Sequence, residues 1–174
     1  MTKTPTFWVY GFEPFLNYSE NITQKVLHHL PDYQNVHTSV LPVVFEPEIF
    51  TQPVQQHRPD VVLGMGQYPR GGMVRLERRA VNLRRDKSKN EVSRPITEGG
   101  PDRLTPSWSI QPNHMSRRTY NAGQYVCNYS MYQLSLLAES QNFDYAFIHI
   151  PKDLSLGLAL WFVKQLLTAR GAKL

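Results

Sequence analysis

Pro59-Asp-Val-Val-Leu-Gly-Met-Gly-Gln67 is the stretch of this sequence that decides the fold. The apolar run Val-Val-Leu inside it is typical of a buried strand. Two glycines and Gln67 end that run, and Pro69 and Gly71-Gly72 follow within five residues. Glycine and proline punctuate regular structure, so the sequence predicts a central strand whose carboxyl end opens into a loop.

Strands and helices are predicted to alternate on both sides of this stretch. The other strands are expected over residues 7–12, 36–45, 73–83 and 142–151, and the helices over 22–30, 46–56, 127–140 and from a cap at Ser155 onward. The segment from Arg84 to Ser116 is polar, rich in Pro and Gly and without a period, so it is predicted to be a loop. This alternation indicates an α/β fold with a mostly parallel sheet and helices on both faces.

Composition narrows the class of protein further. With 174 residues, 41% of them hydrophobic, the chain is expected to form one domain with a full core. The apolar run before Gly11 is only four residues long and no later segment approaches a membrane span, which predicts a soluble cytoplasmic protein. A single cysteine excludes an internal disulfide, and the histidines lack metal-site spacing, so no metal is expected.

The net charge of +5 is concentrated between Arg70 and Arg94. Such a patch suits an acidic partner or nucleic acid, whereas a solvated strand and loop with outward charges is the simpler interpretation. No aromatic residues are interleaved with these basic residues, so the base-stacking platforms of a single-strand binder are missing and nucleic-acid binding is not expected.

The only cysteine lies in Tyr120-Asn-Ala-Gly-Gln-Tyr-Val-Cys127-Asn-Tyr-Ser-Met131, where an irregular segment turns into a helix. A thiol in the first turn sits among unpaired backbone N–H groups at the positive end of the helix dipole, and both favour the thiolate. Cys127 is therefore a candidate nucleophile. The alternative is that it is a small buried hydrophobic residue.

Gly11 to Phe15, Gln67 and His149 lie at predicted strand ends, where parallel α/β sheets bind their ligands, and Glu77 lies in the middle of the strand predicted over 73–83. Cysteine catalysis needs a thiolate, an imidazole that shares its proton, and a third group that fixes the imidazole tautomer. Cys127, His149 and Glu77 are the residue types required. Individually, His149 could be a hydrogen-bonded core histidine, and Glu77 could pair with a neighbouring arginine.

Seven segments are spread over most of the chain: Gly11-Phe-Glu-Pro-Phe15, Leu41-Pro-Val-Val-Phe45, Gly66-Gln67, Glu77-Arg-Arg-Ala-Val-Asn82, Gly100-Pro101, Ala122-Gly-Gln-Tyr-Val-Cys-Asn128 with Met131-Tyr132, and Phe147-Ile-His-Ile-Pro151. Together, and in this order, they resemble the pyroglutamyl peptidase I (pyrrolidone-carboxylate peptidase) family. The resemblance implies that residues 1–174 form a single domain of this kind, a three-layer α/β/α sandwich with a mostly parallel twisted sheet.

The resemblance also implies an activity, that of a cysteine omega peptidase which removes an N-terminal pyroglutamyl residue from peptides through a thioacyl-enzyme. By motif position Cys127 is the nucleophile, His149 is the base and then the acid, and Glu77 orients His149. The backbone N–H of Cys127 holds the oxyanion, and either Arg85 or Lys87 is a candidate to assist it. No metal or cofactor is needed.

The substrate pocket implied by the resemblance contains seven further residues. Phe12 and Phe15 are expected to stack on the lactam ring, and the pocket is completed by Asn21, Val43, Gln67, Val126 and Met131. A small uncharged ring with one N–H and one C=O suits aromatic faces and a few placed polar groups, such as the Gln67 amide.

Two departures from the family leave a second hypothesis open. Arg103 to Tyr120 is too short and too polar for the helix and strand that the family carries before its cysteine motif, and only Lys152-Asp-Leu separates Pro151 from Ser155. We expect an active peptidase with a more open site, because all three catalytic residue types are present. The alternative is a binding or regulatory homologue that uses the basic stretch from Arg70 to Arg94.

Family members often form tetramers, so a homo-oligomer is a further expectation.

Overall fold

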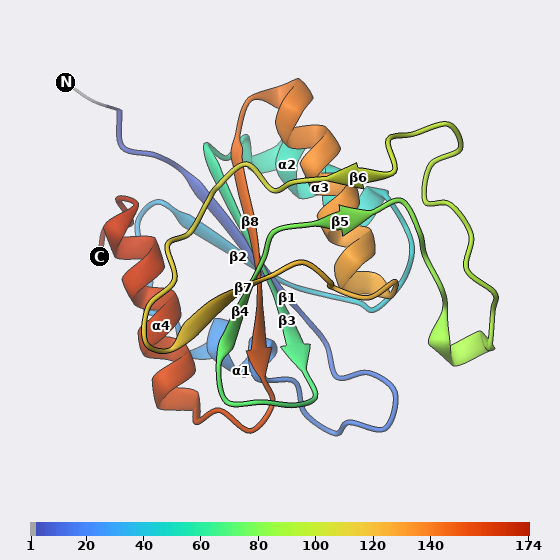
Figure 1. Cartoon of the computed structure of the whole chain (residues 1–174). Coiled ribbons are helices and arrows are strands. Elements are labelled where there is room, and N and C mark those ends of the chain that lie inside the picture. Colours follow the sequence, from blue (N-terminus) through green and yellow to red (C-terminus); the bar gives the residue numbers. More distant parts are fainter. Residues whose placement is uncertain (1–2) are drawn as a thin grey trace.

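A central sheet of six strands organises the molecule, and the computed structural model describes residues 3–174 (Figure 1). The strands are β1 (Phe7–Phe12), β2 (Val36–Leu41), β3 (Val61–Tyr68), β4 (Val74–Glu77), β7 (Ser116–Thr119) and β8 (Asp144–Pro151). They lie in the order β2-β1-β3-β8-β4-β7. Neighbouring strands are parallel except for the pair β4 and β8, which is antiparallel. The predicted mostly parallel sheet is confirmed.

Four helices cover the two faces of this sheet. They are α1 (Ile22–His29), α2 (Glu48–His57), α3 (Val126–Gln141) and α4 (Leu156–Ala169). Apolar residues of α1 and α4 pack into one core cluster and those of α2 and α3 into another, on opposite sides of the sheet (Figure 1). The result is a three-layer α/β/α sandwich. None of the helices in residues 3–174 combines the length and the apolar composition needed to cross a membrane.

Local sequence explains where several elements begin and end. Asn21 caps α1, its side-chain oxygen accepting the Thr23 N–H, and the Ser155 hydroxyl accepts the Leu158 N–H at the start of α4. The strand predicted over 36–45 ends earlier, at Leu41, because Pro42 follows and has no N–H to donate to a neighbouring strand.

The strand predicted over residues 73–83 is two strands in different sheets, so this prediction was wrong. β4 belongs to the central sheet, whereas β5 (Ala80–Val81) pairs with β6 (Arg103–Leu104) in a separate two-stranded sheet. The chain turns away at Arg78, whose backbone N–H donates to Thr119 O and whose guanidinium donates to the carbonyls of Pro106 and Trp108. The residues that make these contacts with Arg78 are distant from it in sequence. The alternation of apolar and polar residues over 73–83 therefore gives no sign of the break.

The predicted loop from Arg84 to Ser116 is mostly irregular, with a short 3₁₀ helix η1 (Lys87–Lys89) and the strand β6. The structure corrects one expectation for the segment that follows. Residues 103–120 contain no helix, as expected, but Ser116–Thr119 is a strand, β7. It lies at the edge of the sheet, where polar side chains can reach solvent, which is why a hydrophobic pattern did not reveal it.

Candidate active site

A row of four residues crosses the sheet at the end of β3 and organises the site. Gly66 on β3 pairs in register with His149 on β8, His149 pairs with Arg75 on β4, and Arg75 pairs with Arg117 on β7. Residues paired in this way carry their side chains on the same face of the sheet. The register therefore places one imidazole beside a glycine on one side and two guanidinium groups on the other.

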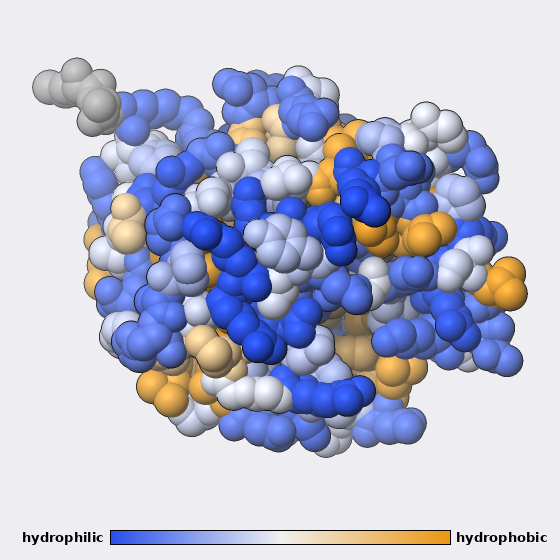
Figure 2. Space-filling view, viewed as in Figure 1, coloured by the Kyte–Doolittle hydropathy of each residue, from blue (hydrophilic) through white to orange (hydrophobic). Residues whose placement is uncertain are grey.

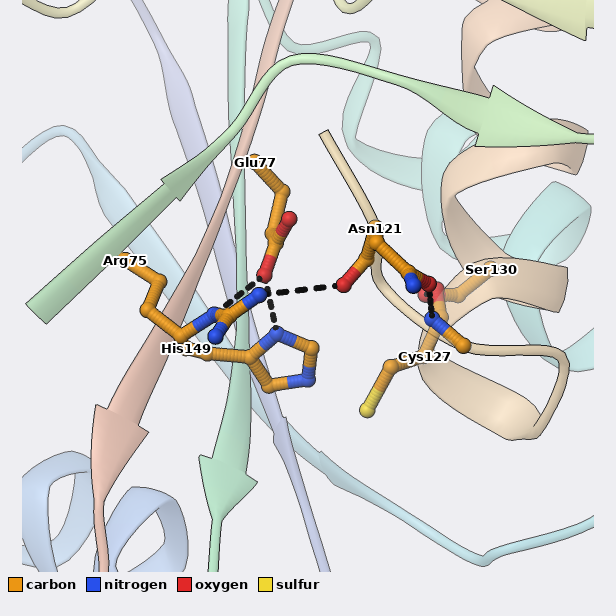
Figure 3. Close-up of polar contacts among 7 residues, drawn as sticks. Arg75, Glu77, Asn121, Cys127, Ser130 and His149 are labelled. Carbon is orange, nitrogen blue, oxygen red and sulfur yellow. Dashed lines mark hydrogen bonds and ion pairs between the residues drawn. The ribbon is translucent and has the colours of Figure 1, made fainter. Parts of the chain in front are cut away.

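Glu77 joins this row from two positions further along β4, on the same face as Arg75. Its Oε1 lies 2.8 Å from His149 Nδ1, and both side chains are buried. Because the carboxylate accepts at Nδ1, that nitrogen carries the proton and the opposite ring nitrogen, Nε2, is directed away from Glu77 (Figure 3).

Cys127 approaches the imidazole from the first turn of α3 (Figure 3). A Cβ built on Gly66 would lie 2.6 Å from Cys127 Sγ and 3.0 Å from His149 Nε2. Cys127 Sγ and His149 Nε2 therefore lie together above Gly66, in space that the side chain of any other residue would occupy. The three predicted catalytic residues are brought together by the structure, although they are far apart in sequence.

Two hydrogen bonds hold the start of α3 in place. Cys127 O accepts a hydrogen bond from the Ser130 hydroxyl (2.9 Å), and Ser130 in turn accepts from the buried Tyr10 hydroxyl (3.0 Å). At the helix N-terminus, Tyr125 makes no side-chain capping bond, and the first turn contains no acidic residue. The backbone N–H groups of the first turn, where Cys127 lies, are therefore not capped by the Tyr125 side chain.

The neighbouring groups shift the proton affinities of the pair. Burial lowers the pKa of His149, but the charge of Cys127, a hydrogen bond to Cys127 and the contacts with Glu77 outweigh it and raise the pKa from 6.5 to about 9. Burial raises the pKa of Glu77, and the hydrogen bond and charge of His149 outweigh it and hold that pKa below 4.5, with smaller help from Thr119 and Arg75. The imidazolium and the carboxylate are the favoured forms.

Arg75 is a member of the site that sequence reasoning missed. Its Nε donates to Glu77 Oε1 (3.1 Å), its terminal nitrogen donates to Asn121 O (3.1 Å), and its guanidinium lies 4.2 Å from the centre of the Tyr68 ring. It therefore ties the carboxylate to the segment that leads into α3. The signal was present, because a residue two positions before Glu77 on a strand must share its face.

Glu77 retains one atom without a partner. Its Oε2 and the Thr119 hydroxyl are both buried and neither forms a hydrogen bond of normal geometry. The Thr119 hydroxyl still favours the charged carboxylate, because it lies close enough to contribute to the lowered pKa of Glu77. Glu77 therefore acts on the site through Oε1, which holds the His149 ring in place.

A cavity of about 470 Å³ opens over these groups. It is lined by Phe15, Leu16, Tyr18, Gln67, Tyr68, Pro69, Arg75, Lys87, Asn121, Ala122, Gly123, Tyr125, Cys127 and His149. Two of the seven predicted binding residues, Phe15 and Gln67, are among them. Gln67 Oε1 accepts the Ile22 N–H (2.9 Å), whereas its Nε2 is buried without a hydrogen-bond partner.

The other five predicted binding residues do not line this cavity. Phe12 is buried with its ring edge against Tyr10, and Asn21 is buried as the cap of α1. Val126 and Met131 lie in the core, and Val43 lines a separate hollow beside η1. Their role in binding remains a prediction from the resemblance.

The two candidates for an accessory cation are separated by the structure. Lys87 lines the cavity with its Nζ 5.7 Å from the centre of the Tyr125 ring, whereas Arg85 Nε donates to Glu91 O (2.9 Å) and does not line it. Among residues 3–174, no three His, Cys, Asp or Glu side chains are grouped so as to hold a metal ion.

The fold and the thiol, imidazole and carboxylate side chains at the end of the sheet define an α/β protein with the groups of a cysteine hydrolase. Comparison with known proteins gives the family. Residues 6–154 match the model of the pyroglutamyl peptidase family, and the chain belongs to this family.

Individual relatives agree with this assignment. The chain is 30% identical over 164 residues to the pyrrolidone-carboxylate peptidase of Bacillus subtilis, covering 81% of this chain and 75% of that one. It is 27% identical over 165 residues to that of Saccharolobus islandicus, covering 84% and 79%. Among solved structures, a mutant pyrrolidone carboxyl peptidase of Pyrococcus furiosus has a TM-score of 0.82 at 23% identity, covering 95% and 97%. Pyroglutamyl peptidase I of Bacillus amyloliquefaciens also has a TM-score of 0.82, at 21% identity, covering 93% and 92%.

Proposed function

We propose that this protein is a cysteine peptidase that removes an N-terminal pyroglutamyl residue from peptides, with Cys127, His149 and Glu77 as its catalytic residues. The single observation that carries the proposal is the position of the His149 ring, hydrogen-bonded to Glu77 through Nδ1 while Nε2 is turned toward Cys127. Membership of the pyroglutamyl peptidase family supports the choice of substrate.

The proposed reaction proceeds in two stages. The Cys127 thiolate attacks the pyroglutamyl carbonyl carbon, and the uncapped N–H of Cys127 at the start of α3 stabilises the oxyanion. As the C–N bond breaks, His149 transfers its Nε2 proton to the leaving amine and a thioester remains on Cys127. His149, now neutral, takes a proton from water, whose oxygen attacks the thioester and releases pyroglutamate and the thiolate.

The electrostatics of the site supply what the first stage needs. With a pKa of about 9, His149 is protonated at neutral pH and can act as the acid that releases the amine. Glu77 is charged there, because its pKa lies below the usual value, and it stabilises the imidazolium and fixes its orientation.

The lining of the cavity suits a pyroglutamyl ring. Phe15, Tyr18 and Tyr125 provide aromatic surfaces, and Gln67 contributes an amide whose Nε2 has no partner within the protein. Among the described residues, those that line the cavity include no Asp or Glu. An ordinary N-terminal ammonium group would find no carboxylate partner there, which favours the uncharged lactam over a free amino terminus.

The proposal is tested by release of a fluorescent amine from pyroglutamyl-aminocoumarin amide under reducing conditions. Prolyl-aminocoumarin amide is the matched control, because it has the same ring size with a charged amine and no ring carbonyl. We expect wild-type protein to hydrolyse the first substrate and not the second, and Cys127→Ala protein to hydrolyse neither. Absence of turnover by folded wild-type protein would favour the binding homologue instead.

A further inference from the structure

A second hollow adjoins the active-site cavity on the side of β4 and β7. It has a volume of about 370 Å³, and Tyr68 and Arg75 line both it and the cavity. Its other charged residues are Arg70, in the loop after β3, and Arg117, on β7. We call the surface formed by Arg70, Arg75 and Arg117 the arginine recess.

The arginine recess carries uncompensated positive charge. Arg75 is paired with Glu77, but Arg70 and Arg117 are exposed and form no ion pair with any residue of 3–174. No carboxylate among the described residues lines either hollow, and Lys87 adds a further cation to the cavity. Figure 2 shows strongly hydrophilic residues gathered over the part of this face where Figure 1 places β4 and β7. Such a surface attracts anions.

The recess lies in line with the catalytic histidine. His149, Arg75 and Arg117 are successive register partners on β8, β4 and β7. Adjacent strands are spaced by about 4.8 Å, so the backbone of Arg117 lies about 10 Å from that of His149. An extended peptide advances about 3.3 Å per residue. The first two residues beyond the scissile bond therefore cover most of the distance between His149 and Arg117, and the Arg117 side chain is long enough to cover the remainder.

The chemistry fixes which part of a substrate faces the recess. His149 protonates the leaving amine, so the leaving portion lies against His149, whose ring centre is 5.6 Å from that of Tyr68. The lactam ring occupies the other end, beside Phe15 and Gln67. Building on the proposed function, we propose that the arginine recess binds a carboxylate on the leaving portion, so that this enzyme prefers pyroglutamyl peptides with an acidic residue or a free carboxyl terminus close to the scissile bond.

Three peptides separate the two sources of the carboxylate. Pyroglutamyl-glutamate amide and pyroglutamyl-glutamine amide differ only in a side-chain carboxylate, and pyroglutamyl-glutamine with a free terminus adds a terminal carboxylate to the second. Exposed ion pairs are worth little individually, so we expect kcat/KM at low salt to be about two- to fivefold higher for a carboxylate-bearing peptide than for the neutral one. The preference should shrink as salt is added.

Arg117→Gln and Arg118→Gln form a matched pair of variants. Both remove one positive charge from β7, but Arg118 is paired with the core residue Leu76, on the opposite face from Arg75, and its guanidinium donates to Gln111. We expect Arg117→Gln to reduce the preference for carboxylates and Arg118→Gln to preserve it. Equal kcat/KM values for all three peptides with wild-type protein would overturn the proposal, and so would equal losses in the two variants.

Binding to Cys127→Ala protein distinguishes this inference from the proposed function. If no peptide is hydrolysed by wild-type protein, the peptidase assignment fails, but Kd values for the same three peptides still test the recess. Tighter binding of the carboxylate-bearing peptides, weakened by Arg117→Gln and not by Arg118→Gln, would support the recess. Equal Kd values, or no binding of any of the peptides, would reject it.

Discussion

The proposed catalytic groups and the walls of the cavity are built from different kinds of structure. Glu77 and His149 lie on paired strands, Cys127 lies in the first turn of a helix, and Glu77 is hydrogen-bonded to both His149 and Arg75. Much of the cavity wall comes instead from the irregular segments 13–20 and 121–125. The register of the sheet thus fixes Glu77 and His149, and the start of α3 fixes Cys127, whereas the proposed contacts to substrate depend on loops.

This difference predicts that the sheet and the loops contribute differently to reaction rate and to substrate binding. Register pairing across β3, β8 and β4 leaves little freedom to the residues that must approach one another closely. Loops tolerate substitution better, and they are where related proteins vary their specificity. Changes in the sheet should therefore reduce the rate of reaction, and changes in the loops should mainly alter the binding of substrate.

The largest effect is expected when His149 is replaced. His149→Gln removes the group that gives a proton to the leaving amine, so kcat/KM for pyroglutamyl-aminocoumarin amide should fall on the order of 10⁴- to 10⁶-fold. His114→Gln, at an exposed position outside the site, is the matched control and should retain the wild-type rate. A modest loss in His149→Gln would mean that another group transfers the proton.

Replacing Glu77 by glutamine should have the next largest effect. The neutral amide no longer fixes the tautomer and orientation of His149, and kcat should fall on the order of 10²- to 10⁴-fold. The pH profile gives a second readout. Wild-type kcat/KM should decline as pH rises through about 9, because His149 then loses the proton it must donate.

In Glu77→Gln protein this alkaline limit should move to lower pH, because the carboxylate helps to raise the pKa of His149. An unchanged limit would show that Glu77 does not act through the imidazole. The profile thus separates a positioning role from a loss of stability, which would lower the rate without displacing the limit.

Gly66→Ala tests the close approach of thiol and imidazole. The added Cβ would lie 2.6 Å from Cys127 Sγ and 2.9 Å from His149 Cδ2, so one of the two must move. A displacement of this size should lower kcat about 10²-fold. Gly157→Ala in α4 introduces the same methyl group where nothing beyond its chain neighbours and the adjacent helix backbone lies within 4 Å, and it should leave kcat unaltered. Equal behaviour of the two variants would contradict the geometry above Gly66.

The smallest effects are expected in the wall of the cavity. Phe15→Ala removes an aromatic surface and should raise KM about tenfold with little change in kcat. Val43→Ala separates two expectations: the resemblance places Val43 in the pocket, whereas the structure places it at another hollow and predicts an unchanged KM. Steady-state kinetics of both variants would decide between them.

Most of the fold could be predicted because its main elements are coded locally. The apolar runs of β1, β3 and β8 and the helical spacing in α3 and α4 are visible without any long-range information. The division of residues 73–83 and the strand β7 were missed for a physical reason. Both depend on partners distant in sequence, such as the bond from the Arg78 N–H to Thr119 O, and β7 is too polar to show a buried face.

The same distinction applies to the site. Cys127 was predicted from its place at a helix start, His149 from its place at a strand end, and Glu77 from its residue type and the resemblance, and the structure brings the three together. The space above Gly66 was not identified, because the pairing of β3 with β8 cannot be read from either strand alone. Arg75 was missed although its spacing from Glu77 places both side chains on one face of the strand. Phe12 and Met131 were expected in the pocket, but their apolar side chains are buried in the core.

The central claim, that Cys127 is acylated by the pyroglutamyl group, is tested most directly with pyroglutamyl p-nitrophenyl ester. A good leaving group makes acylation fast, so hydrolysis of the thioester becomes limiting and the intermediate accumulates. We predict a burst of about one nitrophenol per chain, with the acyl group found by mass spectrometry on the peptide that contains Cys127. Hydrolysis of the ester by Cys127→Ala protein at the wild-type rate, or an acyl group on a different residue, would contradict the account.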